Sequence, residues 1–142
     1  MYLQFKQFHS FIAYLVLAVL IFVLIYSIYS WLTKKSYTKN NRILVLLGMA
    51  LVHIQFLLGV LLYFLSPLGL SNFSGEAMKN SISRLYILEH PFVMVIAFTF
   101  ITIGFMKSNR INNDNQKYKS IVLFYSIALI CILSRIPWSV WI

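Results

Sequence analysis

Charged residues are scarce in this sequence, and acidic residues are the scarcest. Only 11% of the 142 residues are charged while 61% are hydrophobic, and 12 Lys and Arg against 3 Asp and Glu give a net charge of +9. A soluble domain carries about 25% charged residues, and a disordered chain needs low hydrophobicity. The composition therefore excludes an ordinary soluble enzyme and a disordered protein, and it indicates an integral membrane protein.

The motifs of soluble-enzyme chemistry are also missing. The single cysteine, Cys131, lies within an apolar run, so no intrachain disulfide can form and a packing role is expected. The sequence has no Cys–His spacing of the zinc type, no glycine-rich phosphate motif and no histidine near Cys131 or Ser134. No catalytic residue is therefore assigned, and the sequence leaves open whether the protein is an enzyme.

The sequence does contain four long apolar runs. A helix needs about 20 apolar residues to cross the hydrocarbon core of a bilayer. The runs cover residues 11–32, 43–65, 85–106 and 121–138. They predict an all-α fold, a four-transmembrane-helix bundle that forms a single membrane domain over residues 1–142.

Basic residues flank these runs unevenly, and in membrane proteins the cytoplasmic loops carry the excess of Lys and Arg. Eight of the twelve basic residues lie in the first and third connections: Lys34, Lys35, Lys39, Arg42, Lys107, Arg110, Lys117 and Lys119. These two connections are predicted to face the cytoplasm, with the N- and C-termini outside. Basic residues placed between apolar runs also predict contact with membrane lipid headgroups and argue against nucleic acid as a partner.

Ionisable residues inside a membrane span are costly and mark a functional site by default. They are His53, Glu89, His90 and Arg135, and His9 stands at the mouth of the first span. At about 1.5 Å per residue, Glu89, His90 and Arg135 share one level in the outer half of the membrane. Glu89 and Arg135 can therefore form an ion pair, which either locks the third and fourth helices or tunes a site.

The three histidines admit three interpretations. In the leading one they ligate the iron of haem b between helices, with His90 the first choice, His53 the second and His9 the third. The second interpretation is a quinone or proton site that includes Glu89 and Arg135. In the third, hydrogen-bonded histidines fix helix register in a structural or accessory membrane subunit.

The predicted depths of the histidines constrain the haem interpretation. Counting residues at about 1.5 Å each places both His53 and His9 roughly 9 Å from the level of His90, on opposite sides. Helix tilt, a kink at Pro91 or an offset helix start would close such a gap. A single-ligand haem, or a haem shared across a homodimer, would not need equal depths. Ala97 and Gly104 lie on the His90 face of the third span, where small side chains are expected to leave room for a flat macrocycle.

Pro91 directly follows His90. A proline removes a helical hydrogen bond, here the one to the Ile87 carbonyl, and disfavours helical geometry at the residue before it. The sequence therefore predicts a kink at His90 that opens backbone polar groups beside the imidazole.

Several short segments carry a family resemblance over essentially the whole chain. They are residues 53–59 (HIQFLLG), 62–69 (LYFLSPLG), 89–91 (EHP) and 135–138 (RIPW), together with His9. The segments resemble small four-helix membrane proteins of Bacteroidetes-type bacteria that are labelled cytochrome b or cytochrome b-like. A fainter likeness, on Gln55 and Gly59, runs to the four-helix half-bundle of haem A synthases, although Glu89 here is immediately next to His90.

The resemblance implies a b-type haem in a multi-pass protein of the bacterial inner (cytoplasmic) membrane. It implies electron transfer to or from a quinone or a larger redox complex. In that role Glu89 and Arg135 are expected to tune the site, for example through a bidentate contact of Arg135 with a haem propionate.

Overall fold

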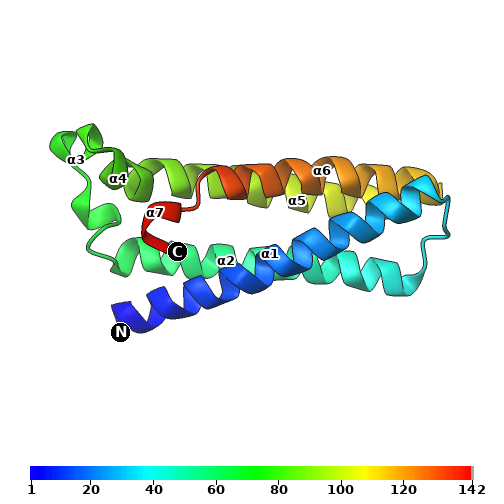
Figure 1. Ribbon diagram of the computed structural model, residues 1–142, viewed down its shortest axis with the longest axis horizontal. Helices are drawn as coiled ribbons and strands as arrows, with labels where there is room; N and C mark the ends of the chain where they lie inside the picture. The colour runs from blue at the N-terminus through cyan, green and yellow to red at the C-terminus, as the bar shows by residue number, and fades with distance from the viewer. Residues whose placement is uncertain (142) are drawn as a thin grey trace.

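The computed structural model describes residues 1–141 and shows an all-α protein built on four long helices (Figure 1). These are α1 (Tyr2–Leu32), α2 (Lys39–Leu65), α5 (His90–Arg110) and α6 (Asp114–Ser134). Helices α1 and α5 each pack on both α2 and α6, so α1 and α5 lie diagonally across the bundle. Both termini lie at one end (Figure 1). The predicted four-helix bundle is confirmed.

Short elements cap the end that holds the termini. They are η1 (Leu70–Asn72), α3 (Gly75–Lys79), α4 (Ser81–Arg84), the π-helical turn η2 (Leu85–Glu89) and α7 (Trp138–Trp141). Elements α4, η2 and α5 run on as one helical segment. After α6 the chain turns into α7 and back onto α1, where Trp141 stacks on Tyr14 with ring centroids 4.4 Å apart.

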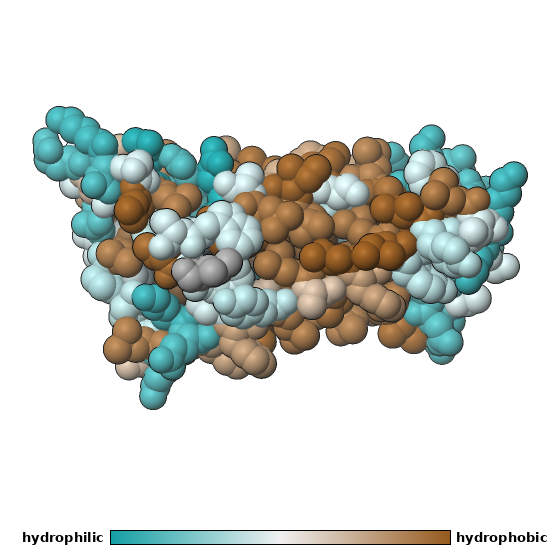
Figure 2. Space-filling view, viewed as in Figure 1, coloured by the Kyte–Doolittle hydropathy of each residue, from teal (hydrophilic) through white to brown (hydrophobic). Residues whose placement is uncertain are grey.

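Each of four segments is long and apolar enough to cross a membrane: Tyr2–Leu32, Lys39–Leu65, Ser81–Arg110 and Asp114–Ser134. A broad hydrophobic band covers the middle of the molecule, with hydrophilic residues at both ends (Figure 2). Large apolar side chains are exposed throughout the band, as expected where lipid rather than water is the solvent. The protein is therefore a small multi-pass membrane protein.

The fourth helix ends earlier than the apolar run that predicted it. Helix α6 stops at Ser134 instead of residue 138, and Arg135 leaves helical geometry at φ −129° and ψ 18°. Pro137 explains the difference, because proline disfavours helical geometry at the residue before it, here Ile136. The carbonyl groups at this helix end are left without helical partners, which matters for the site described below.

Helices α5 and α6 pack closely at Gly104. A Cβ atom placed there would lie 2.6 Å from Phe124 Cβ, so even alanine forces the helices apart. We expect Gly104→Ala to lower the free energy of unfolding by about 1–2 kcal/mol, as overpacking does elsewhere. The measurement is thermal unfolding in detergent, followed by circular dichroism.

The matched control for this prediction is Gly75→Ala. A Cβ at Gly75 meets no atom within 4 Å, so this substitution should leave the melting temperature within about a degree or raise it slightly. Equal losses in the two variants would show that the close approach at Gly104 does not limit stability.

Candidate functional site

His9 of α1 and His90 at the start of α5 meet at the end of the bundle that holds both termini. Their ring centroids are 6.4 Å apart and their planes are nearly perpendicular, at 86°. Because α1 and α5 are diagonal partners, the two rings meet across the bundle interior. The predicted depth difference between these histidines is wrong. Helix α1 runs obliquely across the bundle (Figure 1), and a residue count along untilted helices does not include this tilt.

A backbone hydrogen bond orients the His90 ring. His90 Nδ1 lies 2.7 Å from the carbonyl oxygen of Arg135, one of the carbonyls beyond the last turn of α6. A carbonyl only accepts hydrogen bonds, so Nδ1 carries the proton and Nε2 keeps its lone pair. Metal-ligating histidines are commonly held in this way, with one ring nitrogen donating to a carbonyl and the other free to bind.

On α2, Gln55 and Gly59 lie one helical turn apart and both contact His9. We call these three residues the His9 seat. The Gln55 side-chain nitrogen donates to the backbone carbonyl of His9 at 2.8 Å and lies 3.4 Å from His9 Nε2. A Cβ at Gly59 would lie 3.2 Å from His9 Cε1, so the imidazole rests against this glycine. In the sequence, Gln55 and Gly59 carried the fainter family likeness, and their contact with His9 was not predicted.

Two polar atoms of this seat lack partners. His9 Nε2 faces an amide donor and therefore accepts, which places the proton on Nδ1. Both His9 Nδ1 and Gln55 Oε1 are buried without a hydrogen-bond partner among residues 1–141. Unpartnered buried polar groups are rare in native proteins and point to a ligand or an ordered water.

Three charged side chains surround the start of α5. The predicted ion pair is present, with Arg135 Nε 3.6 Å from Glu89 Oε1. Arg84 was not predicted to take part, yet its Nε lies 2.7 Å from Glu89 Oε2. Residues five apart do not share a face in an α-helix. The π-helical turn η2 follows i to i+5 spacing and brings Arg84 into contact with Glu89.

The same turn resolves the strain at Pro91. His90 keeps helical geometry at φ −62° and ψ −53°, and its N–H donates to the Leu85 carbonyl five residues back. The expected departure of His90 from helical geometry is therefore wrong, because the wider turn accommodates the proline ring, whereas the expected loss of the helical donor to Ile87 stands. The carbonyl of Ile87, which Pro91 deprives of a helical donor, accepts from the Tyr63 hydroxyl at 2.9 Å.

The structure places His53 elsewhere, between α2 and α5. Its Nε2 lies 2.8 Å from Thr102 Oγ1, and Thr102 Oγ1 itself donates to the Phe98 carbonyl. The hydroxyl proton is therefore used, so the His53 Nε2–H donates to the hydroxyl. Thr102 is 12 residues beyond His90 on the same helix, or roughly 18 Å along its axis. His53 thus takes part in a helix-to-helix bond, not in the pair.

The small residues after His90 do not leave an open space. Gly104 receives Phe124 and Tyr125 of α6, and Ala97 is buried in the apolar core with 1% of its surface exposed. The expectation that they make room for a macrocycle is wrong, because α6 packs against Gly104 and Ala97 is enclosed in the core.

No protein family, curated protein or solved structure matched this chain. The fold and the site define a small multi-pass four-helix protein with two histidines paired across one end of the bundle. Within residues 1–141 no three His, Cys, Asp or Glu side chains are grouped to hold a metal ion. A metal bound by the two imidazoles would therefore need to bring most of its own ligands, as a haem iron does.

Proposed function

We propose that the protein is a small b-type haem protein that transfers electrons within the membrane, with His90 and His9 as the axial ligands. The observation that carries this proposal is the meeting of two histidines from diagonal helices, with ring centroids 6.4 Å apart. Imidazole nitrogens lie about 2 Å from a bound metal, so two rings that share one metal have centroids about 6 Å apart. Haem supplies a one-electron redox centre when bound.

The chain's own groups fit that ligand set. The Nε2 lone pair of His90 is free because Nδ1 is held by Arg135. The Nε2 lone pair of His9 is engaged only by Gln55 at 3.4 Å, longer than the usual hydrogen bond between nitrogen and its acceptor. Arg84 and Arg135 face the single carboxylate of Glu89, which leaves one positive charge in excess. That charge suits an acidic substituent such as a propionate.

A second candidate function is a quinone site, and the unpartnered atoms of the His9 seat favour it. The buried His9 Nδ1–H offers a donor to a quinone carbonyl, and Gln55 Oε1 offers an acceptor to the reduced hydroxyl. This site would use the same end of the bundle without an iron. For either function we propose the bacterial inner membrane as the location. The proposed partner is a redox complex or a second copy of the chain.

The decisive experiment is a dithionite-reduced minus oxidised absorption spectrum of the full chain, purified after expression with ample haem. We expect a b-type spectrum and about one haem per chain, quantified as the pyridine haemochrome. A protein that folds but contains no haem would overturn the haem proposal. The quinone site would then be tested by extracting the purified protein and assaying the extract for bound quinone.

A further inference from the structure

The end of the bundle opposite the histidine pair is strongly basic and unneutralised. It carries eight Lys and Arg in the two connections, and its one carboxylate is Asp114, since Glu76 and Glu89 lie at the other end. The ion pairs within residues 1–141 join only residues of the histidine end. The eight basic side chains are thus available to an external anion.

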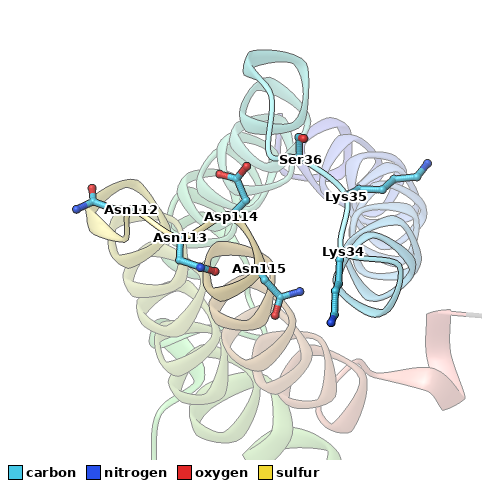
Figure 3. Close-up of a pocket in the computed structure, with 7 residues that line it drawn as sticks. All are labelled: Lys34, Lys35, Ser36, Asn112, Asn113, Asp114 and Asn115. Carbon is cyan, nitrogen blue, oxygen red and sulfur yellow. The ribbon is translucent and has the colours of Figure 1, made fainter.

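Two depressions lie in this basic end. The first has a volume of about 370 Å³ and is lined by Lys34, Lys35, Ser36, Asn112, Asn113, Asp114 and Asn115. Figure 3 shows the Asp114 carboxylate within this depression, while Lys35 extends away from it. A fixed negative charge opposes a second anion at this distance, so this depression is the poorer anion site.

The second depression carries no carboxylate. Its volume is about 390 Å³ and its lining residues are Tyr37, Thr38, Lys39, Arg42, Asn109 and Lys117. We call it the Arg42 depression. Three of the six side chains are cationic, and the other three offer hydroxyl or amide groups, which is the composition expected of a phosphate site.

Neutral partners hold two of these cations in place. Arg42 Nε donates to Asn109 Oδ1 at 3.1 Å, which leaves the two terminal guanidinium nitrogens free. Lys117 Nζ donates to the Ser108 carbonyl at 2.8 Å and lies 5.4 Å from the centre of the Tyr37 ring. These contacts order both side chains without cancelling their charge, so little conformational entropy is lost when an anion binds.

Two further features of the Arg42 depression suit an anion. Helix α2 begins here, capped by Thr38, and the N-terminus of a long helix carries a partial positive charge. The Tyr37 hydroxyl is buried without a hydrogen-bond partner among residues 1–141. Burial raises the pKa of Tyr37, so this hydroxyl stays protonated and can donate.

We infer that the Arg42 depression binds the phosphate group of an anionic lipid headgroup. The adjoining apolar surface identifies a lipid as the source of that phosphate. On α2, directly after Arg42 and in the following turn, Ile43, Leu46 and Leu47 are exposed by 50%, 36% and 48% and begin the hydrophobic band. An acyl chain can lie on this surface while its phosphate contacts Lys39, Arg42 and Lys117.

The test counts lipids bound to the full chain by native mass spectrometry in a neutral detergent. Phosphatidylglycerol is titrated against phosphatidylcholine, with Arg42→Gln/Lys117→Gln as the variant and Lys34→Gln/Lys35→Gln as the control of equal charge change. Each lost contact weakens lipid binding about fivefold, so the two substitutions together are expected to weaken binding of phosphatidylglycerol roughly twenty-five-fold. Charges beyond the depression are screened. The affinity of the control for phosphatidylglycerol should therefore stay within about threefold of that of the parent chain.

Several outcomes would overturn the inference. Equal losses in variant and control would indicate a diffuse field, and equal binding of the two lipids would indicate no anion site. If inorganic phosphate alone displaces phosphatidylglycerol at millimolar concentration and also protects the parent chain against unfolding, the ligand is free phosphate. If the double variant does not fold, Lys39→Gln changes one exposed side chain, and binding unchanged from the parent in that variant would also contradict the inference.

Discussion

In His90→Ala, the b-type spectrum of the purified protein is expected to disappear, with haem content at least about tenfold lower than in the parent chain. The substitution removes the imidazole whose Nδ1 is held by the Arg135 carbonyl and whose Nε2 keeps its lone pair. In His9→Ala, His90 remains as a single axial ligand, so we expect either the same loss or a changed absorption spectrum at reduced haem content. The measurement is the pyridine haemochrome per chain, together with the reduced and oxidised spectra.

His53→Ala is the matched control for both variants. It removes a histidine from a membrane helix and breaks the bond to Thr102, at a cost of about 1 kcal/mol, but leaves the His9–His90 pair in place. Haem content and spectrum should equal those of the parent. Loss of haem in His53→Ala, with retention in His90→Ala at equal helical content, would show that the pair is not the ligand set.

The fold could be predicted because a membrane allows few solutions. With no water to satisfy the backbone, an apolar run of about 20 residues must become a helix, and four runs give four helices. The ends of the helices were less predictable. Helix α1 begins at Tyr2 instead of residue 11, because a helix continues through the interface where apolarity no longer marks it. Helix α6 ends early for the local reason that Pro137 supplies.

The candidate site could be predicted only in part. Residue counting placed Glu89 and Arg135 at one level, and they form an ion pair. It could not bring His9 to His90, because their meeting depends on the tilt of α1 and on which helices become diagonal neighbours. Arg84 was missed for a different reason. Its contact with Glu89 exists only where η2 departs from α-helical spacing, and the residues before Pro91 carry no pattern that distinguishes a π-turn from an α-helix.

The clustering of departures from regular structure around His90 is itself informative. The π-turn, the proline and the early end of α6 each leave a backbone carbonyl without a helical donor. Two of these carbonyls are paired by side chains: Ile87 accepts from Tyr63, and Arg135 accepts from His90. The irregular backbone therefore fixes the orientation of the His90 side chain. In a regular helix, this orientation would depend on rotamer preference alone. π-Bulges occur frequently at functional sites.

The Tyr63 contact gives the second large expected effect. Tyr63→Phe removes the side-chain hydrogen bond that the Ile87 carbonyl accepts, and Pro91 has no N–H with which to replace it. A carbonyl without a hydrogen-bond partner inside a membrane span costs up to several kcal/mol. We expect the free energy of unfolding to fall by about 3 kcal/mol and haem content to fall with it, because His90 follows this turn directly.

A double-mutant cycle separates this cause from a general loss of packing. Pro91→Ala restores a backbone N–H that can donate to the Ile87 carbonyl, so Tyr63→Phe in that background should cost no more than about 1 kcal/mol. The coupling of about 2 kcal/mol between the two positions is measured by chemical unfolding of the four proteins in one detergent. If Tyr63→Phe costs the same with proline or alanine at position 91, the hydroxyl does not act through the carbonyl that proline leaves free. The stability that the Tyr63 hydroxyl supplies would then come from another contact with η2.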